Sequence, residues 1–346
     1  MHSLKNSGTN LVIDAIHSGE DVPLKVSLLI IISTLITHLF GGSAGREGAA
    51  LQIGGAFGNY IGKLFHLEER DCKIIIMCGM SACFSALFGT PIAAAVFSME
   101  VISVGIVQYA ALVPCVFAAL IGNGIAGNVF GITGESFFLA DIPALSPGIV
   151  LKLIILSTLF ALVSAFFCVA LNKCTKFMSR FLPNQYLRIA VSGILIVCIN
   201  VLLHTTDYMG AGTEFIAASF VTQAVWYAFL MKILLTTITL TGGFKGGEIV
   251  PCLFIGAALG SFLAPYLGLP IAVCAACGMA GIFCGVTNCP LTSLLLSIEL
   301  FGVGSLHYCA IVIAICYMLS GYYSLYHSQK IVYSKYEPRF INRSAR

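Results

Sequence analysis

Charged side chains are scarce in this sequence. Its 346 residues include 18 Lys and Arg and 15 Asp and Glu, together 10% of the chain, whereas a soluble domain spends about 25% of its residues on charge. Apolar residues make up 58%, and the mean hydropathy is +0.97. Because so few charges cannot cover a soluble fold, the composition excludes a soluble globular enzyme and predicts a multi-pass membrane protein.

Basic runs with interleaved aromatic residues are also missing, which excludes a nucleic-acid partner and leaves small solutes and membrane lipid. The fourteen cysteines are scattered singly, and only Cys274 and Cys277 have a C-x-x-C spacing, without a second pair. We therefore predict small buried thiols, with no disulfide framework, no metal site and no cofactor.

The apolar segments are short. Many have fewer than the roughly 20 residues that a membrane-spanning helix needs, and glycine-rich or proline-containing breaks separate them at 41–48, 89–91, 242–247 and 288–290. Helices that stop partway through a membrane produce this pattern, and irregular backbone at that depth must line a cavity. The predicted fold class is all-α, with broken or re-entrant helices.

The breaks occur twice along the chain. Segment 79–100 matches segment 278–299 at an offset of 199 residues, with identical Gly, Met, Phe, Pro, Ser and Glu positions. Segment 41–58 matches segment 243–260 at an offset of 202 residues. An internal duplication with paired broken helices is typical of transporters, whose solute site lies between the repeats.

We place the first half-repeat at 1–147, the second at 148–328 and a short basic tail at 329–346. Gly247 lies 99 residues beyond residue 148, where the second half begins, but its counterpart Gly45 lies only 44 residues beyond residue 1. The first half is therefore about 55 residues shorter, enough for one or two helices. We expect an N-terminal truncation or a misassigned start, which leaves the ability to transport open.

Charge asymmetry predicts the orientation. Loop 172–188 carries four basic residues and no acidic one, and the tail after Gln329 has five basic residues against one acidic. The positive-inside bias places both on the cytoplasmic side. We expect the inner or cell membrane of a bacterium.

Segments 41–49 and 242–251 each open an apolar helix with several glycines. A helix N-terminus offers unpaired N–H groups and a partial positive charge, so two such ends can hold a dehydrated anion without a full cationic charge. Glu47 begins the first of these helices. Its carboxylate could occupy the anion site and leave when protonated, which would gate anion movement. An ion pair with Arg46 or a simple first-turn glutamate explains the residue equally well.

The motifs resemble those of the CLC family of chloride channels and anion/proton exchangers. Segment 45–49, Gly-Arg-Glu-Gly-Ala, resembles the family's G-[K/R]-E-G-P motif with alanine in place of proline. Segment 247–251, Gly-Glu-Ile-Val-Pro, resembles G-x-F-x-P with isoleucine in place of phenylalanine. Segment 6–10 keeps the Ser-Gly of G-S-G-I-P. The resemblance covers nearly the whole chain, from Lys5 to Tyr336.

This resemblance implies an inverted-repeat membrane fold, a homodimer with one pathway in each subunit, and roles for particular residues. Glu47 matches the external gating glutamate, and Ser7 matches the serine that contacts the central anion. Glu248 and Ile249 match the pair whose backbone N–H groups bind the same anion, and Tyr326 matches the tyrosine that closes the inner end. The motif glycines are Gly45, Gly48, Gly246 and Gly247.

One departure concerns protons and the transported ion. The family's chloride/proton exchangers have an inner glutamate directly after the acid that matches Glu100, and Val101 stands there in this chain. Channels and bacterial fluoride/proton exchangers of the family also lack that acid, and the flanks of both glycine motifs resemble the fluoride exchangers more closely. Ser7, however, stands where the fluoride exchangers usually carry methionine. We favour chloride-type transport, with fluoride export as the alternative. Whether the protein is a channel or a proton-coupled antiporter stays open.

Two further alternatives belong to other classes. Segment 41–45 fits G-x-S-x-G, so Ser43 could be the nucleophile of an intramembrane serine hydrolase with His204 or His307 as its base. The second alternative is a membrane scaffold that transports nothing. For the paired acids Glu100 and Glu299, their symmetric positions favour helix capping or ion pairing over a role in transport.

Overall fold

The computed structural model describes residues 8–137, 139 and 141–345. Within them the fold is mostly helical, which confirms the predicted fold class. The first part contains α1 (Thr9–Ser18), α2 (Lys25–Leu39), α3 (Glu47–Leu64), α4 (Glu69–Phe88), α5 (Pro91–Glu100), β1 (Ser103–Val104), η1 (Tyr109–Ala111) and α6 (Leu112–Asn128). The second part contains α7 (Pro147–Phe181), α8 (Gln185–Leu203), α9 (Thr213–Ala218), α10 (Ala228–Gly242), α11 (Ile249–Leu267), α12 (Ile271–Thr287), α13 (Pro290–Phe301), η2 (Val303–Ser305) and α14 (Leu306–Leu319), followed by β2 (Lys330–Tyr333) and β3 (Phe340–Ser344).

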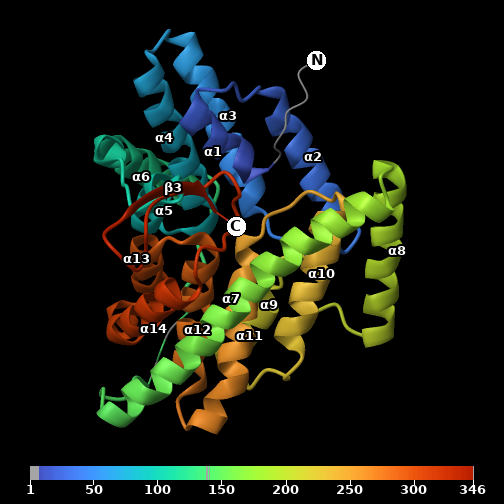
Figure 1. Ribbon diagram of the computed structural model, residues 1–346, viewed down its shortest axis with the longest axis vertical. Coiled ribbons are helices and arrows are strands. Elements are labelled where there is room, and N and C mark those ends of the chain that lie inside the picture. Colours follow the sequence, from blue (N-terminus) through green and yellow to red (C-terminus); the bar gives the residue numbers. More distant parts are fainter. Residues whose placement is uncertain (1–7, 138, 140, 346) are drawn as a thin grey trace.

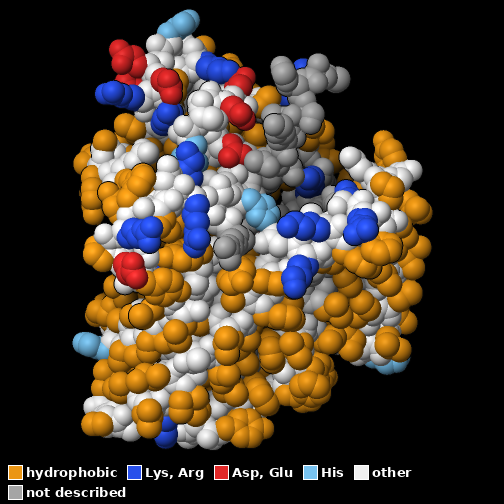
Figure 2. Space-filling view, viewed as in Figure 1, with side chains coloured by type: hydrophobic (Ala, Val, Ile, Leu, Met, Phe, Trp, Pro, Cys, Tyr) orange, Lys and Arg blue, Asp and Glu red, His pale blue; other side chains and the backbone are white. Residues whose placement is uncertain are grey.

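The helices and the surface are those of a multi-pass membrane protein. Five helical segments in the described residues are long and apolar enough to cross a membrane, and six more apolar helices have 10–17 residues. The long segments are 69–88, 109–128, 147–181, 185–203 and 249–267. Figure 2 shows an almost wholly apolar lower half, with Lys and Arg gathered across the upper part. Lipid is therefore the solvent for most of this surface.

The two repeats are oriented in opposite directions. Helices α3 and α11 start from a shared point near the middle of the molecule and run away from it, one upward and one downward in Figure 1. Each is followed by the same pair of elements, a long helix and then a short one that begins with proline. The boundary between halves stays a prediction, but α7 begins at Pro147, beside it.

The same device breaks the helix in both repeats. Helix α4 ends at Gly89 with φ 71°, and α12 ends at Asn288 with φ 58°, a left-handed conformation that glycine and asparagine tolerate. Pro91 and Pro290 then begin α5 and α13, where a missing N–H costs nothing. The predicted breaks at 89–91 and 288–290 are confirmed.

Glu100 and Glu299 each cap a helix of the opposite repeat. The Glu299 carboxylate accepts hydrogen bonds from the backbone N–H groups of Ile92 (2.9 Å) and Ala93 (2.8 Å), at the start of α5. Glu100 accepts from the backbone N–H groups of Leu291 (3.0 Å) and Thr292 (2.8 Å), and from the Thr292 hydroxyl (2.6 Å), at the start of α13. The predicted capping role is confirmed, with each acid reaching across to the opposite repeat.

The tail forms an element that the sequence did not predict. Strand β2 pairs parallel with β1, with Ser103 opposite Lys330, and antiparallel with β3. The segment expected as a plain basic tail is therefore folded against the end of the first repeat. The reason lies in the tertiary structure, because β1 is too short to be recognised from sequence and supplies the edge on which β2 forms.

Glycines hold the helix pairs at close distance. In the first repeat Gly54 of α3 faces Gly79 of α4, and in the second Gly256 of α11 faces Gly278 of α12. A Cβ atom at any of these positions would overlap the backbone of the facing helix. Each pair therefore depends on the absence of a side chain.

Replacing Gly256 by alanine should lower stability by about 1–3 kcal/mol, because the added methyl group forces α11 away from α12. Thermal unfolding of the detergent-solubilised protein would show a lower midpoint. Gly124→Ala on α6 is the matched control, since only a side-chain atom at 4.0 Å lies near that position. Equal midpoints for the two variants would contradict the role of the glycine contact.

Candidate functional site

The two glycine motifs meet through a pair of backbone hydrogen bonds. The N–H of Gly45 donates to the carbonyl of Gly247 at 2.8 Å, and the N–H of Gly247 donates to the carbonyl of Gly45 at 2.9 Å. Segments about 200 residues apart are thereby joined at equivalent positions of the two repeats. We call this contact the glycine junction.

The other motif glycines pack around the glycine junction. A Cβ atom on Gly48 would meet the backbone of Gly246 and Gly247, and one on Gly246 would overlap the side chain of Ala44. Helices α3 and α11 both begin next to this contact, at Glu47 and Ile249. Two helix N-termini with their unpaired N–H groups and partial positive charge therefore converge, as the sequence predicts for an anion site.

The Glu47 side chain lies in the glycine junction itself. It is fully buried, and its Oε1 accepts a hydrogen bond from the backbone N–H of Val250 at 3.0 Å. A Cβ atom on Gly45 or on Gly247 would overlap the carboxylate, and one on Gly247 would also lie 2.7 Å from the backbone nitrogen of Gly48, so Gly247 in particular requires glycine. The carboxylate of one repeat thus sits on the first turn of the helix of the other repeat.

Only half of this carboxylate is satisfied. Glu47 Oε2 is buried and has no hydrogen-bond partner among the described residues. No ion pair between Glu47 and Arg46 occurs in the same part of the chain, although the sequence allowed one. A buried carboxylate oxygen without a partner costs free energy, so Oε2 can accept a further hydrogen bond or a proton.

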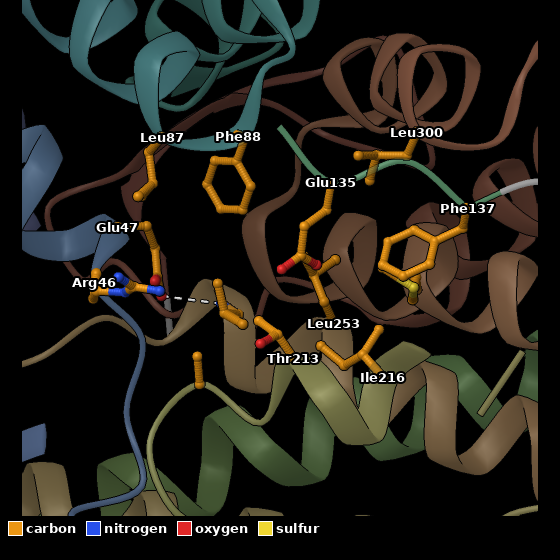
Figure 3. Close-up of a pocket in the computed structure, with 13 residues that line it drawn as sticks. Arg46, Glu47, Leu87, Phe88, Glu135, Phe137, Thr213, Ile216, Leu253 and Leu300 are labelled. Carbon is orange, nitrogen blue, oxygen red and sulfur yellow. Dashed lines mark hydrogen bonds between the residues drawn. The ribbon is translucent and has the colours of Figure 1, made fainter. Parts of the chain in front are cut away.

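A cavity of about 70 Å³ lies beside the Glu47 carboxylate. We call it the Glu47 cavity (Figure 3). Its walls are largely apolar, and the side chains of Arg46, Glu47, Glu135 and Thr213 supply its polar groups. Sequence analysis did not single out Glu135 or Thr213, because both come from segments without a motif.

A second cavity, of about 270 Å³, lies at the other predicted anion-binding segment. We call it the Glu248 cavity. Glu248, Asn10, Ser324 and His327 line it. Burial, together with the charge of Lys176, lowers the pKa of His327, so this imidazole is neutral at physiological pH.

Tyr326 follows directly on the segment that lines the Glu248 cavity. The side chain is 1% exposed, and its hydroxyl has no hydrogen-bond partner among the described residues. A buried hydroxyl that is left unpaired costs free energy, so this hydroxyl is free to donate a hydrogen bond. Ser7, the remaining predicted anion ligand, lies outside the described residues.

Gln329 holds the segment that carries Tyr326, and the sequence analysis missed it. Its amide group donates to the carbonyls of Val101 (3.0 Å) and Thr287 (2.8 Å) and accepts from Asn288 Nδ2 (3.0 Å) and Ser324 Oγ (2.9 Å). All four of its hydrogen-bonding positions are used, within a fully buried site. Only the fold brings these groups together, so no local sequence pattern predicts the hydrogen bonds of Gln329.

Lys335, in the C-terminal tail, contacts the same region near the end of α12. Its ammonium group donates to the Asn288 side chain and to the Tyr317 carbonyl (3.0 Å), and lies over the Tyr317 ring at 4.4 Å. Burial lowers the pKa of Lys335 to about 8. The tail sheet therefore anchors the end of α12 and the loop before Tyr326.

Lys232 is a second cation that no motif indicated. It is fully buried on α10, and its ammonium group donates to the carbonyls of Tyr208 (3.1 Å) and Gly210 (2.8 Å). Gly210 in turn donates to the carbonyl of Gly42, in the first glycine motif. Lys232 thus ties the loop before α9 to the segment that leads into the glycine junction.

Ser43 has no hydrolase arrangement around it. Its hydroxyl lies 3.0 Å from the Thr236 hydroxyl, and its backbone N–H donates to Thr239 at 3.1 Å. Neither His204 nor His307 is among its hydrogen-bond partners in the described chain. Ser43 follows a helix rather than a strand, so the strand-to-helix elbow that a nucleophilic serine needs is also missing there.

The model of a protein family described as voltage gated chloride channel matches residues 1–321. The chain belongs to this family. The predicted resemblance is therefore confirmed, and members of this CLC family are channels and transporters rather than enzymes.

Similar proteins support the assignment of this CLC chain. A protein named "Chloride/fluoride channel protein" from Pseudomonas syringae pv. tomato is 35% identical over 338 residues, which cover 96% of this chain and 75% of that protein. The crystal structure of a CLC-type fluoride/proton antiporter is 37% identical, with a TM-score of 0.89, and the match covers 93% of this chain and 82% of the other. A slow cyanobacterial Cl−/H+ antiporter, 22% identical with a TM-score of 0.78, shares the fold over 91% of this chain and 77% of its own.

Replacing Gln329 by leucine should remove four buried hydrogen bonds and loosen the segment that carries Tyr326. We expect a loss of about 2–4 kcal/mol in stability, since each lost hydrogen bond contributes about 0.5–1.5 kcal/mol. Thermal unfolding of the CLC chain in detergent measures this loss. Gln108→Leu, at an exposed glutamine, is the control, and equal stability of the two variants would remove the anchoring role from Gln329.

Proposed function

We propose that this chain transports small monovalent anions across the membrane by proton-coupled exchange, with Glu47 as the gate and fluoride as the favoured ion. The single observation that carries the proposal is the Glu47 carboxylate in the glycine junction, at the convergence of two helix N-termini. A carboxylate in that position is a tethered anion. It competes directly with a free anion for the same backbone donors.

Protonation supplies the coupling. A charged Glu47 side chain binds at the start of α11 through the Val250 N–H. When the carboxylate takes up a proton it loses its charge and its attraction to the helix end, so an anion can enter in its place. When the anion leaves, Glu47 releases its proton and returns. One anion movement is then linked to one cycle of protonation.

Fluoride is favoured by the relatives of this chain. The fluoride/proton antiporter is 37% identical to this chain and has the same fold. The residues that flank both glycine motifs also resemble those of the fluoride/proton exchangers. Chloride is the second candidate, supported by the name of the Pseudomonas relative, which includes both ions, and by Ser7 in place of methionine. We propose the same pathway for either ion.

At the other end of the pathway we assign the anion contact to Tyr326 and the backbone at Glu248 and Ile249. The buried Tyr326 hydroxyl without a partner supports this assignment. Val101 occupies the position of the inner glutamate of chloride/proton exchangers, so protons do not enter through that carboxylate. The Glu248 cavity, with its own carboxyl group, is the inner opening of the path.

We infer an orientation in the bacterial inner membrane with loop 172–188 and the C-terminus in the cytoplasm. The basic residues of that loop and of the tail support it through the positive-inside bias. The Glu47 cavity then opens toward the outside. We also propose a homodimer with one pathway in each subunit, as the family resemblance implies.

Glu47→Gln should abolish proton coupling, because an amide neither ionises nor competes as an anion. In liposomes loaded with fluoride or chloride, ion electrodes and a pH electrode would record anion efflux without accompanying proton movement, and with no dependence on pH. Glu69→Gln is the matched control at an exposed glutamate. Unchanged, proton-coupled flux in Glu47→Gln would refute the gate, and no flux in the unaltered chain would favour a non-transporting scaffold.

Tyr326→Phe should raise the anion concentration for half-maximal flux by about tenfold, since a hydrogen bond to a charged group contributes about 1.5–3 kcal/mol. Concentration series of fluoride and chloride in the same liposome assay measure this change. Tyr333→Phe, at a partly exposed tyrosine, keeps the ring chemistry and serves as the control. Identical curves for all three proteins would take Tyr326 out of the pathway.

A further inference from the structure

We propose that Glu135 is a second carboxyl group of the proton path, which exchanges protons with bulk water on the Glu47 side of the protein and passes them to Glu47. This inference rests on the proposed function, because it assigns the route by which the Glu47 gate gains and loses its proton. Glu135 lies in the segment between α6 and α7, outside every motif that the sequence analysis singled out.

The position of Glu135 is the first argument. Glu135 lines the Glu47 cavity together with Arg46 and Glu47. Figure 3 shows its carboxylate pointing into the cavity from the side opposite these two residues. Among the described lining residues, these three alone carry charge.

The segment that carries Glu135 is held on both sides of it. Gly134 lies directly against Gly89, so that a Cβ atom on either glycine would overlap the other's backbone. On the other side, the Phe137 N–H donates to the Leu300 carbonyl at 2.8 Å, and its ring stacks on Phe220 with centroids 4.5 Å apart. The Glu135 side chain is therefore directed into the cavity by contacts of its neighbours.

The walls of the cavity explain why a relay is needed. Apolar side chains form most of them, including Leu87, Phe88 and Leu253. A cavity of about 70 Å³ holds a few water molecules where polar groups bind them, and Glu135, Arg46 and Thr213 offer such groups. Protons that reach Glu47 from this side must cross that space, and Glu135 is the only other carboxyl group among the described residues that line it.

The acceptor is also in place. Glu47 Oε2 is buried, unpartnered in the described chain, and belongs to a residue that lines the same cavity. In the transfer, the O–H bond of the Glu135 carboxylic acid breaks and an O–H bond forms on Glu47, directly or through water. Glu135 is left as a carboxylate and takes its next proton from bulk water, so protons and charge balance.

The environment of Glu135 suits this exchange. Burial raises the pKa of Glu135, while the positive charge of Arg46 lowers it, and the net shift is upward. Glu135 is also exposed to solvent, so it can exchange protons with bulk water, and a raised pKa keeps it protonated for a larger share of the time near neutral pH. Glu214 and Asp141, acids nearby in the fold or chain, are exposed as well but do not line the cavity.

The test is the pH dependence of anion flux in liposomes at equal pH on both sides, which makes the insertion direction irrelevant. Glu135→Gln should slow flux several-fold at neutral and alkaline pH and little at pH 5, where bulk protons are abundant. The profile should therefore move toward acid by roughly one pH unit. Glu135→Asp keeps a carboxyl group and should recover part of the loss, whereas Glu214→Gln should follow the unaltered protein.

A second comparison separates a proton relay from a structural effect. In the Glu47→Gln background, adding Glu135→Gln should change nothing, since no acceptor remains. An unaltered pH profile in Glu135→Gln, or an equal loss with and without the Glu47 carboxylate, would overturn the relay. These outcomes differ from failure of the proposed function, in which the unaltered protein itself shows no pH-dependent flux. Equal thermal midpoints would show that all variants are folded.

Discussion

Two hydrogen bonds between Gly45 and Gly247 are the constraint on which the rest of this structure depends. They bring the two motif segments so close that a Cβ atom on Gly246 or Gly247 would overlap atoms of the other segment. Once they form, α3 and α11 begin at one point and run in opposite directions (Figure 1). The inverted repeat therefore creates a place rich in backbone donors in the middle of an apolar protein.

Glu47, Glu100 and Glu299 each accept hydrogen bonds from a helix N-terminus of the opposite repeat, with different consequences. Both carboxylate oxygens of Glu100 and of Glu299 are hydrogen-bonded, so each is a permanent link between the repeats. At Glu47 only one oxygen is bonded and the other faces no partner among the described residues. The same interaction is thus complete at Glu100 and Glu299 and incomplete at Glu47, which is the observation on which the proposed gate rests.

The two cavities give the site unequal surroundings. The Glu47 cavity is small and mostly apolar, with a few polar side chains from separate segments. The Glu248 cavity is larger, and Tyr326 lies beside it on a loop that Gln329 holds through four hydrogen bonds. One side therefore places a second carboxyl group, that of Glu135, near Glu47, while the other places a buried hydroxyl on a firmly held loop.

The sequence by itself determined the membrane class, the duplication, the helix breaks and the motif segments, because composition, period and glycine or proline positions are local properties of a chain. It did not reveal Glu135, Gln329 or the pairing of β1 with β2, since each depends on groups that are distant in sequence. Whether Glu47 paired with Arg46 or reached the helix of the other repeat was likewise decided only by the tertiary structure. The Glu47 carboxylate accepts a hydrogen bond from the donor that folding brings next to it, and this donor, the Val250 N–H, belongs to the other repeat.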